Sequence, residues 1–335
     1  MENMGNLIGY KYQGVMIIVT GGAGFIGSCI VARLNALGRQ DLLVVDHLTE
    51  IKKNNLQGKR FEQYLDKQEF LDTIEKDRLT SKVNGIIHMG ACSSTLINDV
   101  AYLMKNNFEY SCAVARWALK HEVRLIYASS AATYGDGSLG YRDDEETTRR
   151  LKPLNLYGES KHKFDLWVLD HSLKDKVVGL KFFNVFGPNE YHKGEMRSVM
   201  AKAYDRLLKT GHMSLFKSYC PQYADGQQKR DFIYVKDAVD IVMHFWEHPE
   251  INDLYNVGTG RARSWNDVAL ALFAAVGKKP QIDYIEMPES LRDVYQYFTQ
   301  ADMTKLKEAG YSKPFTSLEE AVRDYAGYLK GHAYI

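Results

Sequence analysis

Short apolar runs rich in β-branched residues recur through the first half of the chain and alternate with segments of helical periodicity. The runs that predict strands are MIIVT (16–20), LLVVD (42–46), GIIHM (85–89), RLIYASS (124–130) and VVGLKFF (177–183). The segments that predict helices lie at 25–37, about 97–120 and about 157–171. Strands that are apolar throughout and alternate with helices predict an α/β fold, in which a doubly wound parallel sheet is covered on both faces.

After Gly187 the pattern changes to a less regular mixture of helices and strands. The predicted elements are a helix at 196–209, a polar loop at 217–228, a strand and helix within 229–240, a strand at 254–260, a helix at 264–277 and a last helix from about 317. We therefore expect an N-terminal tail (1–15), a sheet domain (16–187) and a smaller discontinuous substrate-binding α/β lobe (188–335). Segments such as 229–262 are expected to return to the sheet domain. A ligand would bind between this lobe and the carboxyl ends of the strands.

Composition and charge narrow the function without naming it. The 335 residues carry 43 basic against 42 acidic side chains, a net charge of +1, which gives no support for binding nucleic acid or a membrane surface. No apolar run approaches the ~20 residues of a membrane helix. The four cysteines are far apart in the sequence, which is typical of reduced cytoplasmic thiols and predicts no metal site.

The first predicted strand leads into a glycine-rich loop. MIIVT-GGAGFIG places Gly21, Gly24 and Gly27 between a strand and a helix, the context that makes such a motif specific for a dinucleotide. The glycines allow close backbone approach to a pyrophosphate, and the helix N-terminus favours its negative charge. This loop predicts a Rossmann-type domain.

The end of the second strand leaves the choice of cofactor open. Asp46 follows Gly27 by 19 residues, where an acid normally accepts hydrogen bonds from the adenosine ribose of NAD. The neighbouring His47, Lys52 and Lys53 are basic side chains that could hold the 2′-phosphate of NADP. From these residues alone, either cofactor fits.

A serine, a tyrosine and a lysine form a candidate catalytic group. Tyr157 and Lys161 are four residues apart and share one face of the predicted helix. An ammonium beside a phenol is expected to lower the pKa of the phenol. Ser130 ends the strand RLIYASS, at the sheet edge where a nicotinamide would lie, and its hydroxyl could hold a substrate oxygen.

Eight stretches carry a family resemblance that spans nearly the whole chain from Met16. They are TGGAGFIGS (20–28), HMGACSST (88–95), YASSAATYG (127–135), PLNLYGESK (153–161), FNVFGPNEYHKG (183–194), KRDFIYVKD (229–237), YNVGTGRA (255–262) and YFTQAD (297–302). Together they resemble the extended short-chain dehydrogenase/reductase superfamily. GACSST and NEYHKG are the more specific of these motifs, and their detail is similar to the ADP-L-glycero-D-manno-heptose 6-epimerase family.

The resemblance implies two sets of binding residues. For NADP, the usual cofactor of the family, they are Gly21, Gly24, Phe25, Ile26, Gly27, Asp46, His47, Lys52, Lys67, Met89, Gly90, Ala91, Cys92, Ser93, Asn106, Lys161, Val185 and Lys193. For the nucleotide-sugar they are Asn184, Glu195, Lys202, Phe216, Lys217, Ser218, Tyr219, Arg230 and Tyr295. Arg230 also has a physical argument, because a guanidinium pairs bidentately with a diphosphate. The chain departs from the family pattern at His47, at Glu195 and in a longer insertion at 219–228.

The resemblance further implies epimerisation at C6″ of ADP-D-glycero-D-manno-heptose through a transient 6″-ketone, with hydride returned to the other face. The hydroxyl oxygen points to opposite sides before and after inversion, whereas proton transfer needs a reach of ~2.6–3.2 Å, so we expect two acid/base groups. Tyr157 would be one, with Lys161 as its partner and Ser130 as a polar helper. Lys193 would be the other.

Two further expectations come from the resemblance, and three alternatives compete with it. The product would supply heptose for the lipopolysaccharide inner core, and the enzyme would be a homo-oligomer, with pentamers known among relatives.

A UDP-hexose 4-epimerase would share the fold and Ser130, Tyr157 and Lys161 without needing Lys193. A 4,6-dehydratase is disfavoured because no carboxylate follows Ser130. A non-catalytic NADP-binding protein would tend to lack one of the three groups, all of which are present.

Overall fold

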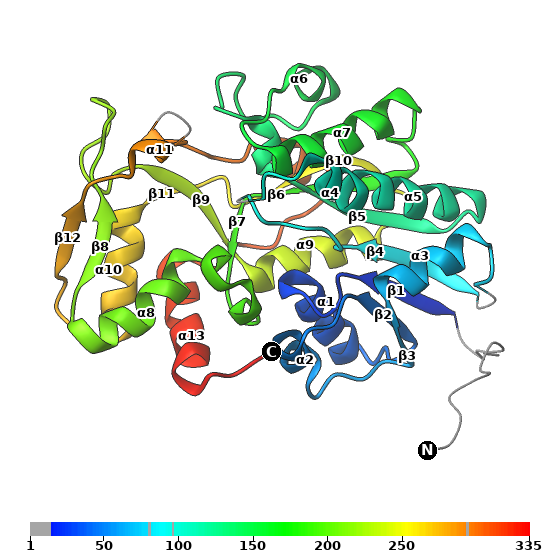
Figure 1. Cartoon of the computed structure of the whole chain (residues 1–335), viewed down its shortest axis with the longest axis horizontal. Helices are drawn as coiled ribbons and strands as arrows, with labels where there is room; N and C mark the ends of the chain where they lie inside the picture. The colour runs from blue at the N-terminus through cyan, green and yellow to red at the C-terminus, as the bar shows by residue number, and fades with distance from the viewer. Residues whose placement is uncertain (1–14, 80–81, 96, 293–294) are drawn as a thin grey trace.

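The computed structural model describes residues 15–335 except 80–81, 96 and 293–294 (Figure 1). The predicted N-terminal tail lies, apart from Val15, outside the described residues. Seven parallel strands form the central sheet in the order β10-β6-β5-β4-β1-β2-β3. Their bounds are β1 (Met16–Thr20), β2 (Leu42–Asp46), β3 (Gln63–Asp66), β4 (Val83–His88), β5 (Arg124–Ser130), β6 (Val177–Phe182) and β10 (Asp253–Val257). The sheet confirms the predicted doubly wound Rossmann-type class.

Helices cover both faces of this sheet because the strands are apolar on both sides. In β1, Ile17 and Val19 join the apolar cluster of the face under α1 and α9, whereas Ile18 joins the cluster of the opposite face under α3, α5 and α7. The helices on the two faces are α1 (Phe25–Ala36), α2 (Glu50–Leu56), α3 (Lys67–Glu75), α4 (Val100–Leu103), α5 (Tyr110–Lys120), α6 (Glu145–Arg150), α7 (Leu156–Asp170) and α9 (Val235–Glu247).

The helix expected at about 97–120 begins later and is interrupted. It starts after Asp99, whose carboxylate accepts from the backbone N–H of Tyr102 at 2.9 Å and caps α4. A π-helical turn, η1 (Met104–Glu109), then separates α4 from α5. Such turns occur mostly as single insertions in α-helices, frequently at functional sites.

The smaller lobe is built from short strands and three packed helices. Strands β7 (Asn184–Phe186), β9 (Lys229–Tyr234) and β11 (Ala262–Ser264) form one sheet, and β8 (Met213–Phe216) pairs with β12 (Ile282–Ile285). Helices α8 (Val199–Thr210), α10 (Trp265–Ala275) and α13 (Leu318–Gly331) pack together beside them (Figure 1). The remaining short elements are η2 (Ala131–Tyr134), η3 (Tyr191–Met196), α11 (Glu289–Arg292) and α12 (Thr304–Glu308).

The carboxyl ends of the parallel strands place the candidate site at one edge of the sheet. The glycine loop follows β1, residues 89–93 follow β4, Ser130 ends β5, and β7 follows β6 directly. Strand β10, from the second half of the chain, completes the sheet beside β6. Within the described part of the chain, no helix has the length and apolar character needed to cross a membrane.

Candidate active site

The glycine loop is packed so closely against the protein backbone that side chains would not fit at Gly21 or Gly27. Gly21 has φ +67°, and a Cβ there would lie 2.7 Å from the Gly90 nitrogen. A Cβ on Gly27 would lie 2.1 Å from the Gly21 carbonyl oxygen. Gly24 is the N-cap of α1 and supplies no side-chain cap, so the first N–H groups of the helix face the loop without a side-chain partner. This cradle fits the pyrophosphate of a dinucleotide.

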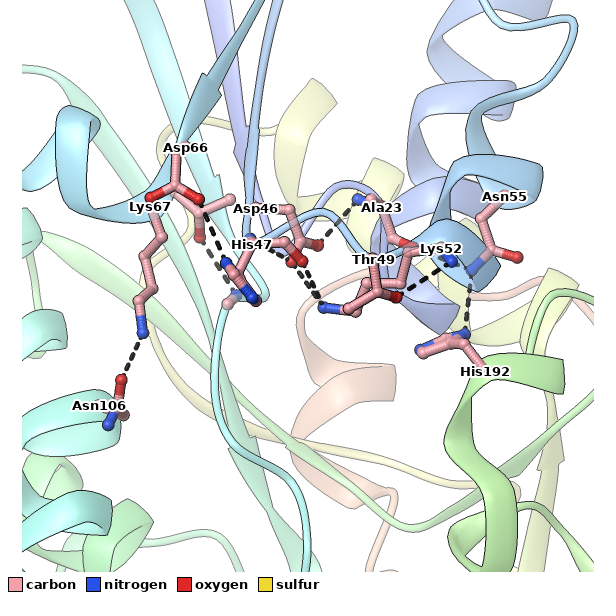
Figure 2. A network of polar contacts seen from close by, with 12 residues as sticks. Ala23, Asp46, His47, Thr49, Lys52, Asn55, Asp66, Lys67, Asn106 and His192 are labelled. Atoms are coloured by element: carbon pink, nitrogen blue, oxygen red, sulfur yellow. Dashed lines mark hydrogen bonds and ion pairs between the residues drawn. The ribbon is translucent and has the colours of Figure 1, made fainter.

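Asp46 already accepts from three donors at the end of β2 (Figure 2). Its Oδ2 accepts from Ala23 N at 3.0 Å, and its Oδ1 accepts from His47 N at 2.7 Å. The ammonium of Lys52 lies 2.7 Å from the same Oδ1. The carboxylate is buried and paired with an ammonium, so it stabilises the loop and much of its accepting capacity is already used.

Two other predicted cofactor-binding residues, His47 at the adenosine ribose and Lys67 in the rest of the groove, lie farther along this edge (Figure 2). His47 is exposed, and its Nδ1 is 3.3 Å from Asp66 Oδ2. Lys67 donates to the side chain of Asn106, which lies in η1, and its ammonium is 5.8 Å from the ring centroid of Tyr110. The structure thus brings Lys67 and Asn106 together, and their assignment to the cofactor groove stays a prediction.

A buried relay fixes the loop that follows β4. The Gly90 N–H donates to Thr20 Oγ1 at 3.1 Å, and that hydroxyl lies 2.6 Å from His88 Nδ1. His88 Nε2 lies 3.0 Å from Ser111 Oγ, which donates to the Asn107 carbonyl. Burial lowers the pKa of His88 to about 3, so the ring is neutral. Every proton then has one assignment: Thr20 donates to Nδ1, and Nε2–H donates to Ser111.

Asn107, in the π-helical turn, clamps the middle of the same loop. Its amide accepts from Cys92 N at 2.7 Å and donates to Cys92 O at 3.0 Å. The same amide donates to Ser160 Oγ at 2.8 Å, and Ser160 donates to the Tyr157 carbonyl at 2.7 Å. The loop after β4 and the start of α7 are therefore held in one hydrogen-bond network.

Tyr157 hydrogen-bonds Ser130, and Lys161 follows Tyr157 by one turn on α7, but one pKa differs from expectation. Asn155 caps α7 through Gly158 N at 2.8 Å, and Tyr157 and Lys161 follow on the first turns. Burial lowers the pKa of Lys161 to about 8, and Asp165 opposes that shift. The pKa of Tyr157 is raised, because burial outweighs the opposing hydrogen bond with Ser130. The expected lowering of the Tyr157 pKa by Lys161 is therefore wrong: desolvation dominates.

A fully buried ion pair lies beneath this group. Lys181 Nζ is 2.7 Å from Asp165 Oδ2, and both side chains are fully buried. The carboxylate also accepts from Ser129 Oγ at 2.7 Å and from Tyr127 OH at 3.1 Å. Asp165 lies one turn after Lys161 on α7, so the pair supports the helix face that carries the candidate acid/base groups.

Lys193 lies against the glycine loop although it is far away in sequence. Its Nζ is 5.4 Å from the ring centroid of Phe25, the first residue of α1. Burial lowers the pKa of Lys193, and the negative charge of Glu190 opposes this. Met196, in the same turn, receives a contact from Thr95 Oγ1 at 3.9 Å, so the segment also touches the loop after β4. The lowered pKa shifts Lys193 toward the neutral amine that a base requires.

The predicted nucleotide-sugar residues fall into separate groups. Arg230 is buried, its guanidinium is 5.1 Å from the ring centroid of Tyr295, and desolvation lowers its pKa. Lys217 pairs with Glu286 at 2.6 Å, and Tyr219 donates to the same carboxylate. These two side chains therefore have an internal partner on the exposed surface.

The other members of this set lie at the edges of the lobe. Lys202 donates to the Glu195 carbonyl at 3.1 Å, so these two residues are neighbours. The Ser218 N–H bonds Asp225 Oδ1 at 2.7 Å, which folds the inserted loop back on its own start. Phe216 ends β8, and Asn184 and Val185 pair with β9.

Sequence reasoning missed several buried polar residues that hold the site together, and five of them show why. Two of them had a signal, because Lys181 and His88 interrupt runs that otherwise predict fully buried strands. The other three come from helices and had none. They are Asn55, Asn107 and Asp165.

Comparison with known proteins identifies relatives over almost the entire chain. The sequence model of the NAD dependent epimerase/dehydratase family matches residues 17–258. The ADP-L-glycero-D-manno-heptose-6-epimerase of Nitratidesulfovibrio vulgaris (strain DP4) is 51% identical over 311 residues, covering 92% of this chain and 96% of that protein. The protein of the same name from Fusobacterium nucleatum is 45% identical over 320 residues, with the same coverage.

A solved structure agrees with these relatives. The crystal structure of the Helicobacter pylori ADP-L-glycero-D-manno-heptose-6-epimerase superposes with a TM-score of 0.79 at 26% identity, covering 95% of this chain and 97% of that one. The dinucleotide cradle and the family match agree on a nicotinamide cofactor.

Proposed function

The chain belongs to the ADP-L-glycero-D-manno-heptose-6-epimerase family, and from that premise we propose that it inverts C6″ of ADP-D-glycero-D-manno-heptose to give the L-glycero epimer. Family membership makes it an isomerase; the substrate and the mechanism are our proposal. The observation that carries the proposal is the placement of Lys193 on the first residue of the dinucleotide helix, 5.4 Å from the ring centroid of Phe25. A 6-epimerase of the two-base kind needs a second proton-transfer group beside the cofactor.

Tyr157 and Lys193 take separate roles in this proposal because they lie on different segments, α7 and η3. When bound, the nicotinamide supplies reversible redox chemistry, taking hydrogen from C6″ as hydride and returning it to the other face of the transient ketone. Tyr157, aided by the Ser130 hydroxyl, exchanges the hydroxyl proton on one side of C6″. Lys193 exchanges it on the other side. One group takes the hydroxyl proton and the other returns a proton to the ketone oxygen, so the two groups end a turnover in exchanged protonation states and reset through solvent. Lys161, one turn after Tyr157 on α7, would supply a positive charge that partly offsets the cost of burying a phenolate.

The environment of Asp46 supports NADP as the cofactor. An NAD site needs a free carboxylate for the ribose hydroxyls, but Asp46 is occupied by Ala23, His47 and Lys52. Lys52 also removes the negative charge that would repel a 2′-phosphate. The side chain of Lys52 remains partly exposed and could bind that phosphate directly.

The nucleotide-sugar would bind across the lobes, with Arg230 at its diphosphate. A buried guanidinium that is flanked by a tyrosine ring and makes no ion pair among the described residues can pair with an anionic ligand. We also propose, from the family resemblance, a homo-oligomer whose product supplies lipopolysaccharide heptose. Native mass spectrometry would count its subunits.

The test is a substrate assay with two nucleotide-sugars. Purified protein with NADP should interconvert the two ADP-heptose epimers and leave UDP-glucose unchanged. Conversion of UDP-glucose to UDP-galactose instead would favour the 4-epimerase alternative, whose fold is the same. Absence of any conversion, with NADP bound, would contradict both.

A further inference from the structure

The turn that carries Lys193 is anchored through a buried asparagine. Asn189 is fully buried and has φ +75°, a left-handed conformation that asparagine tolerates better than most residues. Its amide nitrogen donates to Ser28 Oγ of α1 at 2.9 Å, and its Oδ1 accepts from Ile335 N at 2.9 Å. The turn is therefore attached directly to the helix that begins at the glycine loop.

A second buried asparagine, from α2, joins the same turn to the glycine loop itself. The Asn55 amide nitrogen donates to Ala23 O at 2.9 Å and to Asn189 O at 3.1 Å, and it lies 3.1 Å from His192 Nδ1 (Figure 2). An amide flip would put an oxygen against two carbonyl oxygens, so the orientation is determined. The two hydrogens of the Asn55 amide serve the two carbonyls, so His192 is a close polar neighbour rather than the partner of a third full hydrogen bond. Burial and the charges of nearby Lys52 and Lys193 lower the pKa of His192 to about 4, so the ring is neutral.

These contacts act on residues immediately before Lys193 and on the loop beneath it. Asn55 bonds the carbonyls of Ala23 and Asn189 and contacts the ring of His192. Ala23 lies two residues before Phe25, and His192 directly precedes Lys193. The Lys193 N–H also donates to Glu190 O at 3.0 Å, so the backbone of the turn is closed. We propose that Asn55 and Asn189 are positioning residues that hold Lys193 at the glycine loop, an inference that rests on the proposed acid/base function of Lys193.

The first test follows the turn without any substrate. Asn55→Ala removes the amide bridge, and Asn189→Gly keeps the left-handed backbone but removes the anchor to α1. In either variant we expect the Lys193 amide to exchange with deuterium about tenfold faster, since local opening governs exchange of such a turn. Asn35→Ala is the matched control, because that amide also donates to two backbone carbonyls, Arg39 O and Arg60 O, at the far end of α1.

The second test separates the two proton-transfer groups. Stopped-flow absorbance of the bound cofactor after mixing with each epimer reports oxidation of that epimer alone. Lys193→Met should slow oxidation of one epimer, and Asn55→Ala and Asn189→Gly should slow the same epimer by about 10²-fold, the cost of roughly 1 Å of misplacement. Oxidation of the other epimer should stay within about threefold, as should both oxidations in Asn35→Ala.

A double-mutant cycle decides whether the asparagines act through Lys193. In a Lys193→Met background, Asn55→Ala should add little further loss for the affected epimer, since coupled residues are not additive. Equal losses for both epimers that persist in this background would overturn the positioning claim. The positioning claim would also be overturned if Lys193→Met slowed only one epimer while both asparagine variants kept their oxidation rates and the deuterium exchange of the Lys193 amide unchanged. If Lys193→Met slows oxidation of both epimers equally or of neither, the proposed two-base function is wrong, and this inference, which rests on it, is wrong as well.

Discussion

Replacing Lys52 with methionine is the sharpest perturbation of cofactor choice that the structure offers. Lys52 Nζ is 2.7 Å from the buried carboxylate of Asp46, and only about a quarter of its side chain is exposed. The substitution keeps most of the apolar stem and removes the charge. Asp46 would keep its two backbone donors, Ala23 N and His47 N, so the local fold should survive.

The expected magnitude comes from two effects on a 2′-phosphate. A lost charge-assisted hydrogen bond weakens binding by about 1.5–3 kcal/mol, or roughly 10- to 150-fold. The uncovered Asp46 charge adds repulsion, which solvent and salt screen. NAD carries no 2′-phosphate, and the freed Asp46 oxygen can accept a ribose hydroxyl. NAD affinity should therefore stay the same or increase.

Titration of cofactor-free protein with NADP and NAD by isothermal calorimetry measures both constants. Lys53→Met is the matched control, because Lys53 is the next residue and pairs with Glu50 at 2.6 Å on the exposed surface. We expect the control to change neither Kd by more than about twofold, as exposed pairs contribute little. The reasoning is refuted if Lys52→Met weakens NADP and NAD equally, or if Lys53→Met reproduces its effect.

Three more predictions follow from the site. Lys193→Met and Tyr157→Phe should each lower kcat for epimerisation by about 10²–10⁴-fold, measured by NMR of the sugar; near-full activity of Lys193→Met in both directions would rule out two bases. Because burial lowers the pKa of Lys161 to about 8, below its value in the unfolded chain, the neutral form is favoured by folding. The stability of the protein relative to its Lys161→Met variant should therefore rise between about pH 8 and pH 10.5 in urea unfolding, and a flat difference would contradict that burial. Lys181→Met should destabilise the protein by about 3–5 kcal/mol, because it leaves the Asp165 carboxylate buried without its counterion; a loss below about 1 kcal/mol would show that water or a proton replaces it.

Local spacing explains what could be predicted from the sequence. A glycine loop can be recognised from residues that are adjacent in the sequence. Tyr157 and Lys161 share a helix face because they are four residues apart. The central strands were predictable because burial on both faces demands continuous apolar runs. Strand β3 (Gln63–Asp66) has no such run, since it is an edge strand with one buried residue, and it was missed with the flanking α2 and α3.

The rest of the site depends on contacts that sequence spacing does not encode. Asn55 bonds the carbonyl of Asn189, 134 positions away, and Asn55 stands in no motif, although Asn189 is the first residue of NEYHKG. The pKa of Tyr157 was wrongly expected to be lowered, because helix spacing indicates the neighbouring Lys161 but not the depth of burial. Buried polar networks have this property in general, since each member is justified only by partners that folding supplies.

The central claim is that this chain inverts C6″ by moving hydrogen between sugar and bound cofactor, with no exchange with solvent. Its most direct test is incubation of the NADP-loaded protein in ordinary water with ADP-D-glycero-D-manno-heptose carrying deuterium at C6″, followed by NMR of the product. The account predicts the L-glycero epimer with deuterium retained at C6″. Absence of the L-glycero epimer, or an L-glycero product that has lost its deuterium to solvent, would contradict it.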